Sequence, residues 1–237
     1  MVLQFFLWES RTLPGIFYWE ESMGIEIVSF DVDGTLVDPD YNDLIWQKVI
    51  PELVAKKENI DFDSSLKRVQ REYDRVGDKN NKWYDINYWI GFFRLGVDYK
   101  ELLEKYEKEI KIFPETFQVL EQLADSYQII CVSTMPREFL KPKLKKIENF
   151  FHSTFSALSD YQQLKNKEVY QKICQKINVL PDKMLHIGDS EKSDYLAAKE
   201  AGLKSLLIDR YQLGYQQKYH NDVIQNLSEV MSKLVLL

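Results

Sequence analysis

Polar side chains that can do chemistry stand directly after several short apolar runs of this chain. Residues 31–35 read Asp-Val-Asp-Gly-Thr after one such run, and Ser133 ends another. Lys165 follows a third after a short loop, and residues 188–190 read Gly-Asp-Ser after a fourth, with Asp194 further on. Any one of these could be turn or capping chemistry. Their repeated occurrence at the ends of apolar runs indicates one shared site.

The chemistry that suits this set is phosphoryl transfer. Several carboxylates close together raise one another's pKa unless a cation lies among them, and oxygen ligands without Cys or His suit Mg²⁺. Lys165 and the hydroxyl of Ser133 could bind the oxygens of a phosphoryl group in transit. Asp31 could then attack phosphorus as a covalent nucleophile, and Asp33 could protonate the leaving oxygen and later take a proton from water.

The elements that must position these residues read as alternating strands and helices. Buried strands are expected at residues 25–31, 128–132, 184–187 and 205–208, with a weaker one at 154–158, and helical patterns at 116–124, 169–177 and 195–201. This alternation predicts an α/β fold with a Rossmann-like parallel sheet and helices on both faces. Ligands bind at the carboxyl ends of the strands in such sheets, so the polar residues above are expected to meet at one edge.

Residues 40–112 break the alternation and predict about four helices inserted after the first strand. Leu66, Val69 and Tyr73 recur at helical spacing, with Asp63 or Ser64 as the expected N-cap. We therefore expect an inserted all-helical domain at 40–112 and an α/β core at 23–39 and 113–237. Residues 1–22 are expected to be an accessory extension or a misassigned start. Most of the inserted aromatic residues are expected in that domain's core, with the pocket residues among Tyr84, Tyr88 and Trp89.

Composition excludes several functional classes. A net charge of −6 and 29% charged residues do not provide the basic footprint of a nucleic-acid binder, and 45% hydrophobic residues are typical of a globular protein. No run approaches the ~18 apolar residues that span a bilayer, so no membrane partner is expected. The lysines at 141–146 are expected on a solvated helix face, Arg137 at the surface of a helix start, and the three histidines at satisfied or surface positions.

The two cysteines indicate the compartment of the protein. Cys131 and Cys174 lack metal-like spacing and read as small buried apolar residues of a reducing compartment, which favours a cytoplasmic location. The sequence does not indicate an oligomeric state.

The motifs resemble those of the haloacid dehalogenase-like hydrolase superfamily over about residues 24–210, and in particular its helical-cap, phosphoglycolate phosphatase-like branch. Residues 31–35 are similar to its first motif, Ser133 to its second, and residues 188–194 to its fourth. The resemblance implies that Asp31 is nucleophile and metal ligand. It also implies that Asp33 is acid/base with its backbone carbonyl on the metal, that Asp189 is a metal ligand, and that Asp194 supports the site.

The resemblance also implies Mg²⁺ as cofactor and identifies the inserted helices as a cap that closes over the phosphoryl site. Two motifs depart from the family pattern. The third lacks its usual proline, which leaves Lys165 as the preferred phosphoryl-binding lysine and Lys167 as the alternative. The second has Thr134 where many relatives have Asn, and Thr134 and Gly34 are expected to bind substrate.

The function expected from the sequence is a Mg²⁺-dependent phosphatase that acts on a small phosphorylated metabolite through an aspartyl-phosphate intermediate. The presence of Asp33 favours an oxygen leaving group over a halide. A phosphomutase using the same aspartates and a non-catalytic binding module are the alternatives. Phosphoglycolate-like acids, sugar phosphates and nucleotides all remain open as substrates.

Overall fold

A parallel six-stranded sheet forms the centre of the computed structural model, which describes residues 24–236. The strand order is β3-β2-β1-β4-β5-β6, and every neighbouring pair is parallel. The α/β fold with a Rossmann-like sheet is therefore confirmed, and the expected extension at residues 1–22 lies outside the described residues. The strands are β1 (Ile27–Phe30), β2 (Gln128–Ser133), β3 (Ser153–Ser156), β4 (Met184–Gly188), β5 (Lys204–Ile208) and β6 (Val223–Ile224).

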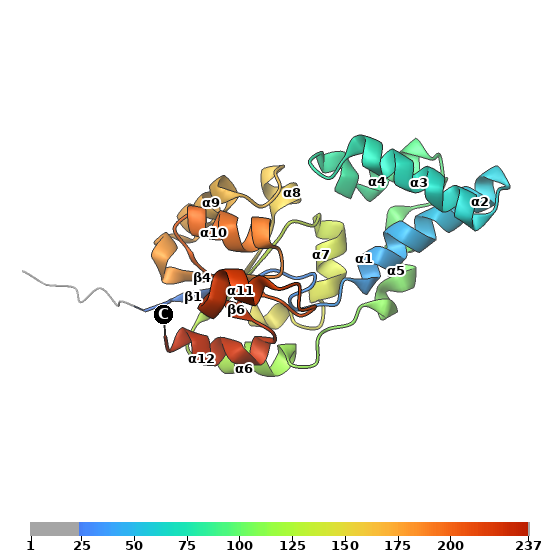
Figure 1. The fold of residues 1–237 in the computed structure, drawn as a ribbon. Coiled ribbons are helices and arrows are strands. Elements are labelled where there is room, and N and C mark those ends of the chain that lie inside the picture. Colours follow the sequence, from blue (N-terminus) through green and yellow to red (C-terminus); the bar gives the residue numbers. More distant parts are fainter. Residues whose placement is uncertain (1–23, 237) are drawn as a thin grey trace, which may run out of the picture.

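Helices cover both faces of the sheet, with α9 and α10 on one side and α6 and α12 on the other (Figure 1). Side chains alternate along a strand, so Val28 and Phe30 of β1 belong to the cluster with α6 and α12, whereas Ile27 belongs to the cluster with α9 and α10. The helices that follow β1 and the inserted segment are α6 (Thr116–Ala124), α7 (Arg137–Leu144), α8 (Ala157–Tyr161), α9 (Lys167–Ile177), α10 (Ala197–Glu200), α11 (Tyr215–Tyr219) and α12 (Val230–Leu234).

Residues 40–109, between β1 and α6, form a helical segment that lies to one side of the sheet (Figure 1). It forms four helical stretches, as the spacing predicted. The first runs through α1 (Asp40–Asp43), a π-helical stretch Leu44–Val49 and α2 (Ile50–Glu58), and α3 (Phe62–Val76), α4 (Ile86–Phe92) and α5 (Tyr99–Tyr106) follow. The expected N-cap of α3 was wrong: Asp61 caps it by accepting from the Ser64 N–H at 2.9 Å. We call residues 40–109 the cap helices.

The two chain crossings between the sheet and the cap helices are paired with each other. Val37 forms an antiparallel bridge with Ile112, and the Asp38 N–H donates to the Lys111 carbonyl at 2.9 Å. These contacts lie next to the boundaries expected at residues 40 and 112. The division into two domains stays a prediction.

The cap helices have their own aromatic core. Trp89 is fully buried, with its ring centroid 4.6 Å from Tyr73 and 5.8 Å from Phe93. The expectation that these aromatic residues form a core is confirmed, and the expectation that Trp89 lines a pocket was wrong. Phe139 of α7 joins the same core and stacks on Trp46 at 5.3 Å, so α7 contacts both parts of the molecule.

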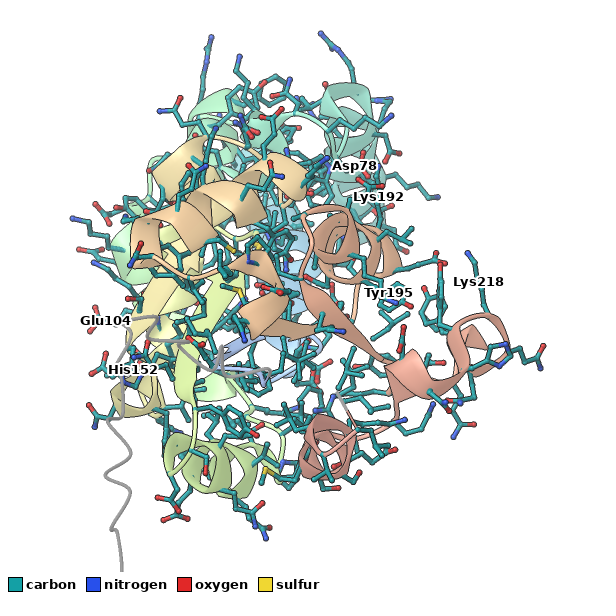
Figure 2. All side chains as sticks on the ribbon, turned by 90° about the vertical axis from the view of Figure 1, so that its left-hand side faces the viewer. Asp78, Glu104, His152, Lys192, Tyr195 and Lys218 are labelled. Carbon is teal, nitrogen blue, oxygen red and sulfur yellow. The ribbon has the colours of Figure 1, made fainter. Side chains whose placement is uncertain are left out.

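Charged side chains such as Lys192 and Lys218 project from the outer surface (Figure 2). His152 and His220 are exposed and His186 is buried with two hydrogen-bond partners, as expected for surface or satisfied histidines. Both cysteines are buried. Among residues 24–236, no helix has the length and apolar character needed to cross a bilayer.

Candidate active site

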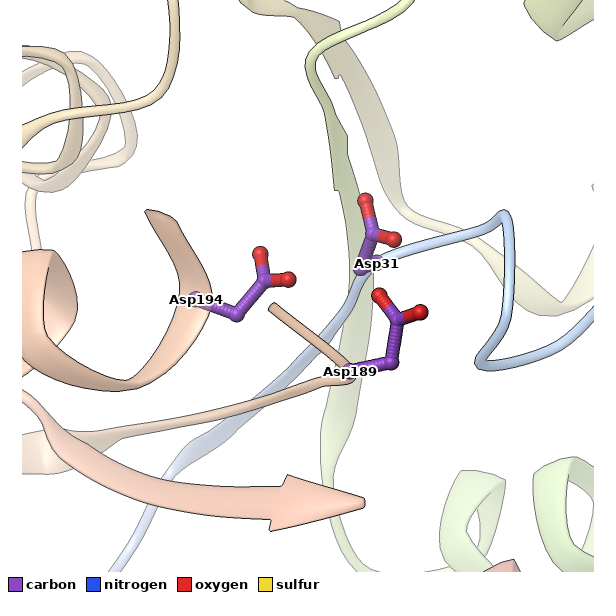
Figure 3. Close-up of side chains that lie close together, drawn as sticks. All are labelled: Asp31, Asp189 and Asp194. Atoms are coloured by element: carbon purple, nitrogen blue, oxygen red, sulfur yellow. The ribbon is translucent and has the colours of Figure 1, made fainter. Parts of the chain in front are cut away.

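Three carboxylates gather where β1 and β4 end side by side. Asp31 follows β1 and Asp189 follows β4. Together with Asp194 they form a group of three, in which each carboxylate offers one oxygen within 4.8 Å of those of the other two (Figure 3). β1 and β4 are parallel neighbours, so their carboxyl ends bring Asp31 and Asp189 together, as the sequence predicted. Asp194 lies in a π-helical stretch, Glu191–Leu196, that begins shortly after the end of β4 at Gly188.

Gly34 lets the loop after β1 approach Asp189. Its φ is +75°, a left-handed conformation that favours glycine, and a Cβ at this position would overlap the Asp189 carboxylate. Arg210, just beyond β5, holds the same loop by donating to the carbonyls of Gly34 at 3.2 Å and Thr35 at 2.6 Å. The backbone of Gly34 therefore shapes the wall of the site, and its substrate-binding role stays a prediction.

Lys165 lies at the centre of the acidic cluster. Its Nζ donates to Asp31 Oδ1 at 2.5 Å and forms an ion pair with Asp194, and the residue is 6% exposed. Asp194 also contacts His186 Nε2 at 3.1 Å and accepts from the Ser190 N–H at 2.9 Å. The structure thus brings Lys165 to the site, whereas Lys167 is exposed at the start of α9.

The cluster holds more negative charge than its own cation balances. Burial raises the pKa of Asp31 well above its ordinary value, with Lys165 opposing the shift and the carboxylates of Asp194 and Asp189 adding to it. Burial also raises the pKa of Asp189 to about 7, with Asp194 adding to the shift. Burial would raise the pKa of Asp194 too, but Lys165 and His186 hold it below its ordinary value. Lys165 thus pairs with both Asp194 and Asp31, and this one ammonium does not balance three carboxylates.

This donor set fits a divalent cation. Asp31 and Asp189 offer carboxylate oxygens, with no Cys or His beside them in the group of potential ligands. A hard cation between them would relieve the repulsion that raises both pKa values. Oxygen ligands that leave room for waters and a phosphate are those that Mg²⁺ prefers.

One cavity of about 210 Å³ is bordered both by the acidic cluster and by most of the other predicted site residues. Ser133 ends β2 and is 1% exposed, and its Oγ accepts from the Met135 N–H at 3.1 Å. The cavity is bordered by all but one of the predicted site residues, namely Asp31, Asp33, Ser133, Thr134, Lys165, Asp189 and Asp194. The exception is Gly34, whose position is described above.

Lys143 was expected on a solvated face, and this prediction was wrong: the residue is 1% exposed and lies next to the site. Its ammonium pairs with Asp33 and donates to Asn42 Oδ1 at 2.7 Å. The spacing held a signal, because Lys143 recurs four residues after Phe139 and beside Leu144 on the buried face of α7. Arg137, expected at the surface, starts α7 and is bound by Asp160 at 2.7 Å.

The fold and site together define a Rossmann-like α/β protein with a lysine-containing acidic centre under a helical insertion. The family model for haloacid dehalogenase-like hydrolases matches residues 25–202, and the chain belongs to that family. The resemblance read from the motifs is therefore confirmed.

Individual relatives agree with this assignment. GMP/IMP nucleotidase YrfG of Escherichia coli is 27% identical over 108 residues, which cover 46% of this chain and 46% of that protein. The putative pyrophosphatase PpaX of Clostridium perfringens is 29% identical over 187 residues, covering 76% and 82%. The crystal structure of a HAD phosphatase from Thermococcus onnurineus superposes with a TM-score of 0.78 at 26% identity and covers 89% and 98% of the two chains. The match to the first relative thus spans about half of its length.

Proposed function

We propose that this protein is a Mg²⁺-dependent phosphatase that hydrolyses a small phosphorylated metabolite through an aspartyl-phosphate on Asp31. The observation that carries the proposal is the arrangement around Asp31. Its carboxylate is buried, paired with Lys165 on one oxygen, and next to Asp189 in a cavity that Ser133 also borders. A nucleophile, a cation-binding carboxylate and two phosphoryl-binding groups thus face one small space.

In the first half of the reaction, an oxygen of Asp31 attacks phosphorus and the bond from phosphorus to the ester oxygen breaks. The Asp33 carboxyl donates its proton to that departing oxygen, which leaves as an alcohol. The ammonium of Lys165 and the hydroxyl of Ser133 bind phosphoryl oxygens, where negative charge concentrates. The products are the free alcohol and a phosphorylated Asp31.

In the second half, water attacks phosphorus while the Asp33 carboxylate takes a proton from it. The bond between phosphorus and the Asp31 oxygen breaks, which regenerates the Asp31 carboxylate and releases inorganic phosphate. Asp33 is protonated again and ready for the next ester. Both half reactions therefore use Asp33 in opposite directions.

Mg²⁺ would be held by the carboxylates of Asp31 and Asp189 and by the backbone carbonyl of Asp33, and when bound it would neutralise charge on the phosphoryl oxygens. Asp194 keeps Lys165 in place through its ion pair and is itself held by His186 and the Ser190 N–H. These contacts fix the lysine beside the nucleophile before the substrate arrives.

The relatives' names support ester or anhydride hydrolysis at phosphorus. They include a nucleotidase, a putative pyrophosphatase and, in Pyrococcus furiosus, a glyceraldehyde 3-phosphate phosphatase. A second cavity of about 210 Å³ adjoins the first and shares Pro39, Asn42 and Met135 with it. We place the leaving group in this second cavity.

The replacement Asp31→Asn tests the mechanism. Loss of the nucleophile should lower phosphate release from a Mg²⁺-supplied metabolite panel by ~1,000-fold or more, because a covalent route has no substitute for its attacking group. The melting temperature should stay equal or rise, because a buried carboxylate with a raised pKa is removed. The matched control is Asp182→Asn, the same substitution at an exposed residue of the α/β part of the chain, away from the site.

Two further measurements complete this test. Beryllofluoride should raise the melting temperature of the wild type only with Mg²⁺ present, and should not do so for Asp31→Asn. A chelator should abolish turnover. Turnover of Asp31→Asn at the wild-type rate would refute the covalent mechanism, and product that retains phosphate at a new position would favour the phosphomutase.

A further inference from the structure

Lys143 is a buried ammonium outside the acidic cluster around Asp31. Its side chain has no exposed surface, and its Nζ lies 5.8 Å from the ring centroids of both Tyr41 and Phe139. An unpaired charge in such surroundings is strongly destabilising. The fold must therefore provide this ammonium with acceptors.

The acceptors come from two other segments of the chain. One is Asp33, in the loop after β1, and the other is Asn42, in α1 at the start of the cap helices. Both Asp33 and Asn42 border the catalytic cavity, but Lys143 does not. Lys143 can therefore affect chemistry in that cavity only through the residues that it holds.

The two oxygens of Asp33 differ in their partners. Oδ1 is bound by Lys143, while Oδ2 is buried and has no hydrogen-bond partner among the described residues. Buried oxygens are usually satisfied, so an unpartnered one next to a cavity has a specific reason. With Oδ1 held by Lys143, Oδ2 is the oxygen whose hydrogen-bonding capacity is left unused.

We propose that Lys143 is the positioning residue of the acid/base Asp33. It fixes the rotation of the carboxyl by binding one oxygen and thereby keeps the other unpaired for the proton transfer. Its second bond, to Asn42, ties this orientation to the placement of α1, so the acid/base is set only when the cap helices are docked. This inference rests on the proposed phosphatase function.

The leaving group gives a direct readout of this role. Phenolate from phenyl phosphate is far more basic than nitrophenolate from p-nitrophenyl phosphate, so only the former depends strongly on proton donation. General acid catalysis contributes ~100-fold or more. Lys143→Met should therefore lower kcat/KM for phenyl phosphate by ~100-fold, and for p-nitrophenyl phosphate by ~10-fold or less.

Matched variants separate positioning from simple structural damage. Lys146→Ala, on an exposed lysine three residues on, should change neither value. Lys143→Arg, which keeps the charge, should restore part of the ratio between the two substrates. Equal losses on both substrates would show a merely structural role, and unchanged or raised kcat/KM in Lys143→Met would overturn the proposal.

A stability measurement tests the Asp33 pairing without turnover. In metal-free protein, the melting shifts of Lys143→Met and Asp33→Asn should not sum in the double variant, because each removes the same ion pair. Additive shifts would refute the pairing. If the wild type released no phosphate from any substrate while the shifts were non-additive, the proposed phosphatase function would fail and the contact between Lys143 and Asp33 would stand.

Discussion

Charge balance at single residues decides what the site can bind. Three neighbouring carboxylates face one buried ammonium, and Lys165 neutralises Asp194 most fully. Asp189 is left with a pKa of about 7, mainly because of its burial. A carboxyl that keeps its proton up to near-neutral pH is a poor metal ligand in acid and a good one in weak alkali, so a metal ion at the proposed site would compete with protons for Asp189.

The same shift sets the pH dependence of stability. The folded-state pKa of Asp189, about 7, exceeds the ordinary value of 3.8, so the folded protein binds protons more tightly than the unfolded chain between those values. The free energy of unfolding of metal-free protein therefore falls as pH rises through that range. Mg²⁺ at ~100-fold above its Kd should raise the melting temperature by ~5–10 °C at about pH 8 and by much less at about pH 5.5.

Thermal melting with and without chelator checks this expectation. Asp189→Asn should reduce the pH slope, to which the raised pKa of Asp31 also contributes, and should remove the Mg²⁺ effect, whereas Asp182→Asn should keep both. A Mg²⁺ shift of equal size at both pH values, or one that survives in Asp189→Asn, would contradict the assignment of Asp189 as a ligand.

Residues with a local signature were predictable, and residues defined by distant partners were not. Asp31 and Asp189 follow apolar strands directly, so strand ends alone place them at one edge. Lys143 is buried because Asp33 and Asn42, about a hundred residues earlier, supply its acceptors. Neither acceptor is near Lys143 in the sequence. Four lysines among residues 141–146 therefore predict a solvated helix face unless such partners are known.

At the scale of elements, the cap helices and the loop between β2 and α7 line the second cavity. Its walls are the aromatic side chains of Trp46, Tyr73 and Trp83, and Asp43 and Gln47 line it as exposed residues. No lysine or arginine is among the described residues that line it. Burial raises the pKa of Asp43, and the carboxylates of Asp40, Asp38 and Asp33 add to that shift, which shows how acidic this region is. A leaving group with its own carboxylate would find no counter-charge here.

Substrate preference should follow from this charge. We expect phosphomonoesters of uncharged leaving groups to be cleaved with higher kcat/KM than phosphoglycolate. Asp43→Lys should raise kcat/KM for phosphoglycolate by ~3–10-fold relative to a neutral substrate, and added salt should reduce the gain because Asp43 is exposed. The measurement is a ratio of kcat/KM values for the two substrates at low and high salt.

The control makes the same charge change elsewhere. Glu121→Lys, on an exposed residue of α6 that does not line the cavity, should leave the ratio unchanged. A wild type that prefers phosphoglycolate, or an equal gain in Glu121→Lys, would show that the second cavity does not receive the leaving group.

Elements were predictable in proportion to their length and periodicity. Each strand predicted from an apolar run overlaps a strand of the structure. The strand β6 was not predicted, because its two residues carry no periodic signal. The helical spacing of the insertion was correct, while the start of α3 was misplaced because Asp61, Asp63 and Ser64 are all suitable caps in sequence. Backbone geometry at Asp61, which is extended with φ −68° and ψ 160°, decides among them.

For the whole molecule, α7 is the element that joins sheet and cap helices. Leu140 and Leu144 belong to the core beneath the sheet, whereas Phe139 belongs to the aromatic core of the cap helices. Phe139 stacks on Trp46 at 5.3 Å and meets Tyr41 edge-on at 6.3 Å. Lys143 lies one helical turn further along the same face. Docking of the cap helices and placement of Asp33 therefore share one helix.

Phe139→Ala tests this connection. Truncating a fully buried phenylalanine should lower the free energy of unfolding by about 3–5 kcal/mol. It should also lower kcat/KM for phenyl phosphate more than for p-nitrophenyl phosphate, because looser packing of α1 on α7 frees the contact between Lys143 and Asp33. Phe117→Ala, on a 43% exposed residue of α6, should cost little in either measurement. If Phe139→Ala lost stability but kept the wild-type ratio between the two substrates, docking and acid/base placement would be independent, and α7 would serve packing alone.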